Sequence, residues 1–144
     1  MSKGVDEADE PVEPGSSPSA ILELVGPDQR VLNLGCATGH LARALALRGC
    51  TVVGVEEDAA AAAKAEDVLE ELVVAGMDGL DLVETFGEGS FDVVVYDDVL
   101  GRLRDPRGSL RQARRLLRPG GSLVASVHNV GHGDIRLALL AGHW

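Results

Sequence analysis

The sequence predicts an α/β fold, a doubly wound Rossmann-like three-layer sandwich built on a mostly parallel sheet of about five strands. Short apolar runs rich in β-branched residues alternate with segments that have helical periodicity. The runs are apolar throughout, which is typical of strands that are buried on both faces of a parallel sheet. Right-handed crossovers between parallel strands then place helices on both faces.

Each expected element has its own signal. Strands are expected over 30–34, 51–55, 72–75, 91–96 and 122–127. Helices are expected over 19–25, 40–48, 59–70, 107–117 and 135–141. Gly26-Pro27 and Gly49 end the first two helices, Asp58 can cap the third, and Pro119-Gly120-Gly121 turns the chain after the fourth. The segment 65–74 (AEDVLEELVV) could also continue as helix, so the third strand has the weakest boundary.

The chain of 144 residues is expected to fold as one domain over 18–144. Residues 1–17 are acidic, rich in Pro, Gly and Ser, and almost devoid of apolar side chains, which predicts a disordered acidic tail. No apolar run approaches the roughly 18 residues of a spanning helix, so no membrane association is expected. The acidic first residues do not resemble a secretory signal, and a cytoplasmic location is expected.

Composition excludes several classes of site. Lys and Arg number 13 against 23 Asp and Glu, a net charge of −10, which argues against nucleic acid as a partner. Cys36 and Cys50 are too few for a disulfide framework or a four-thiolate zinc site. The four histidines fit no zinc spacing, so no metal is expected; they are His40, His128, His132 and His143.

Parallel α/β sheets bind ligands beyond the carboxyl ends of their strands, where the strand order reverses. The loop 35–39 (GCATG) follows the first expected strand, and its glycines allow a ligand to approach the backbone. Glu56 directly follows the second expected strand, 21 residues after Gly35. A carboxylate at this spacing can accept hydrogen bonds from a ribose diol, which predicts a nucleoside-containing cofactor.

Two familiar phosphate-binding loops do not match. The dinucleotide fingerprint GxGxxG requires glycines where Ala37 and His40 stand, and no Gly-Lys-Ser/Thr of a Walker loop follows. Cofactors with a pyrophosphate are therefore disfavoured. A nicotinamide-dependent oxidoreductase stays as the least favoured alternative.

Several motifs together resemble the class I S-adenosylmethionine-dependent methyltransferases. Residues 31–39 (VLNLGCATG) are similar to the family's motif hh(D/E)hGxGxG, and 52–58 (VVGVEED) to its acidic second strand end. Residues 91–100 (FDVVVYDDVL) are similar to its fourth strand, and 116–127 (LLRPGGSLVASV) to its LxPGGxhhhxx turn. Residues 128–144 resemble a PNVxHxxxRLxLLxGxW stretch of bacterial small-molecule methyltransferases. The resemblance covers about residues 29–144 and implies a Rossmann-like fold and S-adenosyl-L-methionine as cofactor.

The resemblance also implies a cofactor site. Glu56 would bind the ribose hydroxyls, and Asp78 would meet the adenine amino group unless Met77 occupies that position. The loop would hold the methionine part, with Asp98 and Val99 beside the sulfonium and the acceptor entrance. The implied cofactor-binding residues are Asn33, Gly35, Cys36, Ala37, Gly39, Glu56, Asp78, Asp98 and Val99.

Four positions depart from the family pattern. Asn33 replaces the usual acid, Ala37 replaces the middle glycine, and His128 replaces a proline. Gly101-Arg102 stands where Glu-His is frequent, which removes an acceptor-side base. The catalytic residue is therefore unassigned, with His128 and His132 as weak candidates beside the simpler interpretation as polar loop residues.

Three further features have competing interpretations. The pair Asp97-Asp98 could perform acid–base work, but a cap or solvated turn is favoured, with Asp98 as a cofactor contact. The arginines of 102–118 could recognise an anionic acceptor or nucleic acid, but they lie opposite Leu110 and Leu117, which favours a solvated helix face. Cys36 near a helix N-terminus would have a lowered thiol pKa, yet it lacks a partner base and is interpreted as packing.

The family fold usually continues with an antiparallel pair of strands, whereas this sequence stops at Trp144. The run 123–127 would then be an uncovered apolar sheet edge. A fragment is favoured over a homo-oligomer in which another subunit covers that edge. The leading hypothesis is methyl transfer from S-adenosylmethionine to a small-molecule acceptor. The alternative is a non-catalytic S-adenosylmethionine-binding or interaction module.

Overall fold

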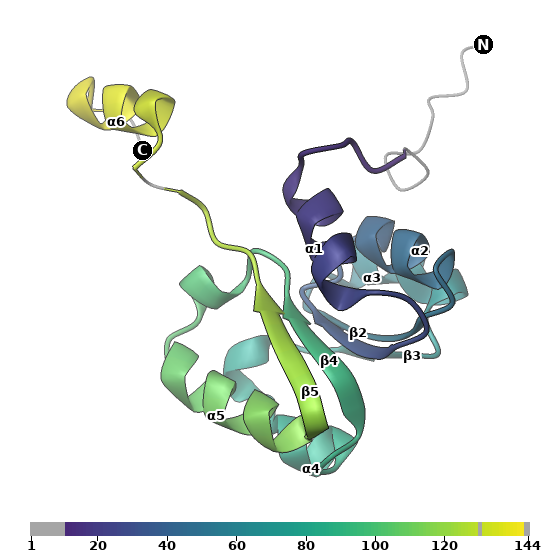
Figure 1. The fold of residues 1–144 in the computed structure, drawn as a ribbon. Coiled ribbons are helices and arrows are strands. Elements are labelled where there is room, and N and C mark those ends of the chain that lie inside the picture. The colour runs from purple at the N-terminus through teal and green to yellow at the C-terminus, as the bar shows by residue number, and fades with distance from the viewer. Residues whose placement is uncertain (1–10, 130, 143–144) are drawn as a thin grey trace.

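A computed structural model of the chain describes residues 11–129 and 131–142 (Figure 1). Its centre is one five-stranded sheet in the order β3-β2-β1-β4-β5, and every adjacent pair is parallel. This order confirms the doubly wound α/β sandwich, because it reverses between β1 and β4. The strands are β1 (Arg30–Leu34), β2 (Thr51–Glu56), β3 (Glu71–Val74), β4 (Phe91–Tyr96) and β5 (Leu117–Ala125).

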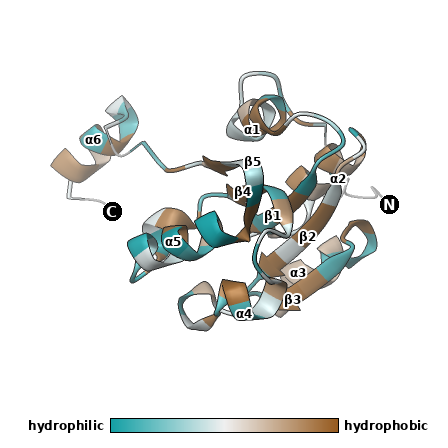
Figure 2. Cartoon of the chain, turned by 60° about the horizontal axis from the view of Figure 1, so that its bottom comes forward, coloured by the Kyte–Doolittle hydropathy of each residue, from teal (hydrophilic) through white to brown (hydrophobic). Residues whose placement is uncertain are grey.

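Helices cover both faces of the sheet and enclose two hydrophobic cores. The helices are α1 (Ser17–Val25), α2 (His40–Ala46), α3 (Ala59–Ala65), α4 (Leu82–Phe86), α5 (Pro106–Leu116) and α6 (Gly133–Leu140). One core joins α1 and α2 to the sheet through side chains such as Ile21 and Leu45, and the other joins α4 and α5 through Leu82 and Leu116. Figure 2 shows the strands as mainly hydrophobic, as burial on both faces requires.

Aspartate side chains cap the starts of several helices. Asp58 accepts hydrogen bonds from Ala60 N and Ala61 N at the start of α3, and Asp105 accepts one from Gly108 N in α5. Each cap satisfies a backbone N–H that has no partner within the helix, and such a cap is typically worth about 1 kcal/mol. The predicted capping role of Asp58 is confirmed.

The third predicted helix is too long. The sequence pattern predicts it over 59–70, but α3 ends at Ala65 and a 3₁₀ turn follows over Glu66–Val68. Leu69 is already extended and packs over Gly54 of β2. The chain therefore leaves the helix early to enter β3, because burial of Leu69 on the sheet outweighs helix propensity. Similarly, α2 stops at Ala46 instead of residue 48.

The Pro119-Gly120-Gly121 segment does not turn the chain away from the sheet. It lies within β5, where the register shifts between Phe91 and Val93 of the neighbouring strand, as in a β-bulge. A Cβ on Gly121 would lie 2.8 Å from Asp92 O, so only glycine fits there. The strand ends at Ala125 rather than at residue 127.

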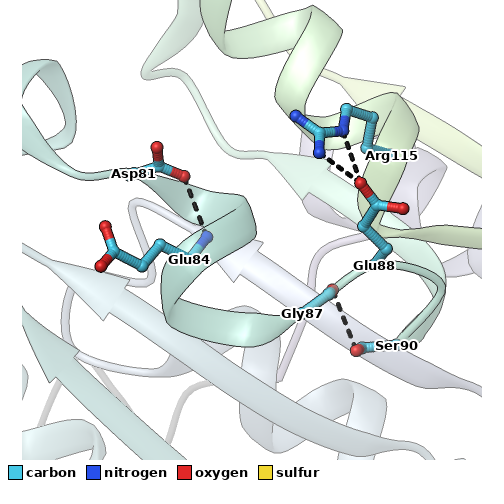
Figure 3. A network of polar contacts seen from close by, with 6 residues as sticks. All are labelled: Asp81, Glu84, Gly87, Glu88, Ser90 and Arg115. Atoms are coloured by element: carbon cyan, nitrogen blue, oxygen red, sulfur yellow. Dashed lines mark hydrogen bonds and ion pairs between the residues drawn. The ribbon is translucent and has the colours of Figure 1, made fainter.

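Helix α4 was missed by the sequence analysis because it is a single short turn. It is capped by Asp81, which accepts a hydrogen bond from Glu84 N at 2.9 Å (Figure 3). The following loop is fixed to α5, since Arg115 Nε donates to Glu88 Oε1 at 2.8 Å. Ser90 Oγ donates to Gly87 O at 3.0 Å. These contacts hold the loop that leads into β4.

The two ends of the described chain lie outside the sheet. Helix α6 stands apart from the sandwich (Figure 1), and Leu140 on it is 84% exposed. The outer edge of β5 pairs with no other described strand. Residues 1–10 of the predicted tail lie outside the described residues, and Ser17 already belongs to α1.

Across residues 11–129 and 131–142, no helix combines the length and the apolar character that crossing a bilayer would require.

Replacing Gly54 tests the packing of Leu69 and Cys36 against β2. A Cβ at this position would lie 2.7 Å from Leu69 Cδ1 and 2.8 Å from Cys36 Sγ. We expect Gly54→Ala to lower the free energy of unfolding in urea by about 1–3 kcal/mol, the usual cost of overpacking. The control Gly101→Ala meets no atom within 4 Å and should change stability by less than about 0.5 kcal/mol. Equal effects of both changes would contradict this packing.

Candidate functional site

A cleft lies at the carboxyl end of the sheet, beside the point where the strand order reverses between β1 and β4. It consists of two adjoining hollows of about 430 Å³ and about 490 Å³ that share four lining residues. The shared residues are Gly35, Glu56, Glu57 and Arg102. The first hollow extends to Gly76, Met77, Asp78, Gly79, Val99, Leu103 and Arg104, and the second to Ala37, Asp58, Ala61, Asp97 and Asp98.

The loop 35–39 forms one side of the cleft. Gly35 N and Cys36 N both donate to Val55 O, at 2.9 and 3.1 Å, which fixes the loop against β2. Gly35 has a φ of +80°, and a Cβ on it would lie 3.1 Å from Asp97 O. Gly39 has a φ of +85° and lies against Ala65, whose Cα would be 3.0 Å from an added Cβ. Both positions therefore require glycine.

Glu56 connects this loop to the start of α3. Its Oε2 accepts a hydrogen bond from Ala37 N at 2.9 Å, and its Oε1 accepts one from Asp58 N at 2.9 Å. Each carboxylate oxygen has a second lone pair, so both can still accept a hydrogen bond from a ligand. Glu56 thus holds a fixed carboxylate at the wall shared by the two hollows.

Ala37 adopts a conformation that suits the glycine it replaces. Its φ is +47°, in the left-handed region that typically costs a residue with a Cβ about 1–2 kcal/mol. The hydrogen bond from its N–H to Glu56 supports this geometry. The side chain lies on the exposed surface of the second hollow, where its methyl group is accommodated.

Asp97 and Asp98 form a tight turn after β4. Asp98 has a φ of +52°, and its N–H donates to Ser126 Oγ at 2.9 Å, while that hydroxyl donates to Asp97 Oδ1 at 3.4 Å. Burial raises the pKa of Asp97 above its ordinary value, and the neighbouring charge of Asp98 raises it further. Both side chains line the second hollow.

Asp78 joins two loops around the first hollow. Its Oδ1 accepts a hydrogen bond from Arg104 N at 2.8 Å, and its Oδ2 lies 3.9 Å from Arg104 Nε. Met77 lines the same hollow, so both candidates for the adenine contact face it. The contact holds the segment 99–104 across the hollow from β2.

Three of the expected cofactor-binding residues, Asn33, Cys36 and Gly39, are buried and line neither hollow. Asn33 is fully buried, and neither of its amide atoms has a hydrogen-bond partner among the described residues. Cys36 is 3% exposed, and burial first and the charge of Glu56 second raise its pKa to about 12. The expected lowering of that pKa is wrong, because burial and the charge of Glu56 both disfavour the thiolate, and α2 begins only at His40. The burial of Cys36 agrees with its interpretation as a packing residue.

The expected base candidates do not reach the cleft. His128 and His132 are exposed and line neither hollow. His132 instead lies at the start of α6, where its Nδ1 accepts from Asp134 N at 3.4 Å. His143 lies outside the described residues. Among the residues that are described, no group of three or more His, Cys, Asp or Glu side chains could hold a metal ion.

Arg102 lines the cleft, although the sequence pattern favours a solvated helix face for it. It was interpreted as part of a solvated helix face, but it precedes α5 and lies in a 3₁₀ turn over Leu100–Arg102. Arg102 is exposed and is a lining residue of both hollows. The available signal was its position, since Gly101-Arg102 replaces the pair that usually faces the acceptor. The other arginines on α5, such as Arg111, do follow the predicted exposed face.

Comparison with known proteins identifies the family. The sequence pattern of a family described as a methyltransferase domain matches residues 12–144, which is most of the chain. The chain belongs to this methyltransferase family. It is also 36% identical over 105 residues to a ubiquinone biosynthesis O-methyltransferase of Pseudomonas syringae pv. tomato. That match covers 70% of this chain and 45% of the relative.

Solved structures support the same fold. An S-adenosylmethionine-dependent methyltransferase from Mesorhizobium loti is 26% identical with a TM-score of 0.66, covering 78% of this chain and 52% of that protein. A possible histamine N-methyltransferase from Thermotoga maritima has a TM-score of 0.67 at 23% identity, covering 85% of this chain and 55% of that protein, and shows the fold alone. The chain spans about half the length of the curated relatives it matches.

The raised pKa of Asp97 predicts how the free energy of unfolding depends on pH. Because the folded-state pKa exceeds the unfolded value near 3.8, the stability associated with this group is greatest below pH 3.8 and is lost as the pH rises through the folded-state pKa. We therefore expect Asp97→Asn to be more stable than the parent at pH 7. The difference should shrink as the pH falls below 4, measured by urea unfolding. Glu23→Gln, on the exposed surface of α1, is the control. A difference that is constant between pH 3 and 7 would contradict the assignment.

Proposed function

We propose that the chain binds S-adenosylmethionine in the cleft and transfers its methyl group to a small-molecule acceptor. The observation that carries the proposal is the carboxylate of Glu56, which is fixed by two backbone N–H groups and still free to accept from a ligand. The first hollow, at about 430 Å³, has the size of a typical small-molecule site. These features fit a nucleoside with an attached amino-acid arm.

In this proposal the cofactor extends over both hollows. Glu56 would accept hydrogen bonds from the ribose hydroxyls, and Asp78 or Met77 would meet the adenine in the first hollow. The loop at Gly35 and Ala37 would lie along the methionine arm, with Asp98 and Val99 beside the sulfonium. The buried Asn33, Cys36 and Gly39 would shape the loop from beneath.

When bound, S-adenosylmethionine supplies an activated methyl group on a positively charged sulfur. The carboxylates of Glu57 and Asp98 line the cleft and favour a cationic ligand over a neutral one. They would therefore bind the sulfonium cofactor more tightly than its neutral product. The remaining contribution of the chain is alignment of the acceptor with the methyl group for in-line displacement.

The acceptor is proposed to be methylated on oxygen. The support is the ubiquinone biosynthesis O-methyltransferases among the relatives. The hydroxyl proton must pass to a base or to water when the methyl group is transferred, and a phenol gives it up more readily than an aliphatic alcohol. His128 and His132 remain proposals for that base, although neither lines the cleft.

The location is proposed to be a reducing cytoplasm, because the thiols of Cys36 and Cys50 are buried and form no disulfide. We also propose that a second subunit covers the outer edge of β5.

The proposed ribose contact can be tested by titration calorimetry. We expect Glu56→Gln to weaken S-adenosylmethionine binding at least tenfold, because one carboxylate oxygen is replaced by an NH₂ group that cannot accept. Glu84→Gln, on α4 and away from the cleft, should bind like the parent (Figure 3). No binding by the folded parent at millimolar cofactor would overturn the proposed function.

A second titration separates the ribose contact from damage to the loop. The parent should bind 5′-methylthioadenosine more tightly than its 2′,3′-dideoxy analogue, because only the former offers hydroxyl donors. Glu56→Gln should lose this preference. A preference of equal size in both proteins would show that Glu56 acts only on the loop.

Turnover distinguishes an enzyme from a binding module. We expect transfer of a tritiated methyl group from S-adenosylmethionine to at least one member of a panel of phenols and catechols. Glu56→Gln should reduce the rate and Glu84→Gln should leave it unchanged. Binding of the cofactor without transfer to any of a broad set of oxygen, nitrogen and carbon acceptors would favour the non-catalytic alternative.

A further inference from the structure

Arg102 is placed to contact a ligand in either hollow of the cleft. It ends the 3₁₀ turn over Leu100–Arg102, and its backbone N–H donates to Val99 O at 3.0 Å. This hydrogen bond holds the backbone of Arg102 close to Val99. Val99 is buried in the wall of the cleft. Of the residues that line the second hollow, Arg102 alone carries a positive charge.

The guanidinium of Arg102 is not used by the protein itself. Among the described residues, no carboxylate lies within ion-pair distance of it, although Glu57 and Asp98 line the same hollow. Arg104, the other arginine in the cleft, contacts Asp78 twice. Its backbone N–H donates to Asp78 Oδ1, and its side-chain Nε lies 3.9 Å from Asp78 Oδ2. Arg115 and Arg118 are likewise paired, with Glu88 and Asp92.

A free guanidinium in a ligand cleft is suited to one chemistry. Its planar set of N–H donors matches the two oxygens of a carboxylate, and such charge-assisted pairs are roughly twice as strong as neutral hydrogen bonds. The carboxylates of the cleft repel an anion, so an acidic ligand would need a counter-charge at its binding point. Arg102 provides one at the edge where the two hollows meet.

We propose that Arg102 binds a carboxylate group of the methyl acceptor, so that the acceptor is an anionic small molecule. This inference rests on the proposed function. The cofactor also carries a carboxylate, but Arg102 is held by its backbone hydrogen bond next to Val99, which is proposed to lie beside the sulfonium and the acceptor entrance. The methionine arm is proposed to lie along Gly35 and Ala37, so Arg102 is assigned to the acceptor. The two sources of a carboxylate give different results in the test.

The experiment compares acids with matched neutral amides. The probes are 3,4-dihydroxybenzoate and 3,4-dihydroxybenzamide, together with the 4-hydroxybenzoate and 4-hydroxybenzamide pair. Each is titrated into the parent with and without saturating S-adenosylhomocysteine. We expect at least one acid to bind about tenfold more tightly than its amide in the presence of S-adenosylhomocysteine. The same titration is repeated with Arg102→Gln, Arg102→Lys and the control Arg111→Gln, an exposed arginine on α5 that lines neither hollow.

The variants decide the outcome. Arg102→Gln should abolish the preference for the acid, Arg102→Lys should keep part of it, and Arg111→Gln should keep all of it. Binding of S-adenosylmethionine should stay within twofold of the parent in Arg102→Gln. Equal or absent binding of acid and amide by the parent would overturn the proposal, and so would a preference that survives Arg102→Gln.

The cofactor titration keeps the two proposals apart. A tenfold loss of S-adenosylmethionine affinity in Arg102→Gln would overturn the acceptor role and assign Arg102 to the cofactor's own carboxylate. If the parent does not bind S-adenosylmethionine, the proposed function fails. An acid preference that depends on Arg102 without S-adenosylhomocysteine would then still support anion binding at this residue.

Discussion

The carboxylate of Glu56 is the contact on which the cleft depends. It accepts from Ala37 N in the loop after β1 and from Asp58 N at the start of α3, so one side chain fixes two loops that come from adjacent strands. Without it, Ala37 would have less support for its positive φ. A carboxylate already held by two donors loses little conformational entropy when a ligand arrives. The position that would recognise a ribose is thus also the position that keeps the cleft in shape.

The sheet topology determines which side chains can meet at this cleft. The order reverses between β1 and β4, so the connections that leave these two strands run to opposite faces and a crevice opens between them. Gly35 faces Asp97 O across this crevice, and only the absence of a side chain allows the approach. The segment 99–104 then crosses to Asp78 and forms the far wall. Residues distant in the sequence become neighbours because the strands are parallel.

Much of this arrangement could be predicted from the sequence, and the failures have physical causes. The strand β1, the glycine loop and Glu56 follow from local pattern and spacing, because each depends on residues close together in the chain. The end of α3 depends on burial of Leu69 against Gly54, and the path of β5 depends on Gly121 fitting beside Asp92, so neither could be read locally. The location of Arg102 in the cleft depends on a turn that has no strong sequence signal.

Several positions that violate ordinary structural preferences gather around the same crevice, whereas Asp28, with a φ of +56°, lies before β1. Ala37 and Asp98 have positive φ angles, Asn33 is buried without a hydrogen-bond partner among the described residues, and burial raises the pKa of Asp97. Each of these features costs free energy, and the rest of the described fold shows few comparable conflicts. Asn33 lies one residue before the end of β1, and Asp97 and Asp98 directly follow β4, so the conflicts lie on the two strands that bound the switch point.

Selection for stability alone would have removed a conflict such as the buried amide of Asn33, since an apolar side chain in its place is chemically simple to reach. The concentration of such conflicts at one place is best explained by a ligand that uses the resulting backbone and charge. This is support for locating the site here that does not depend on the resemblance to any relative.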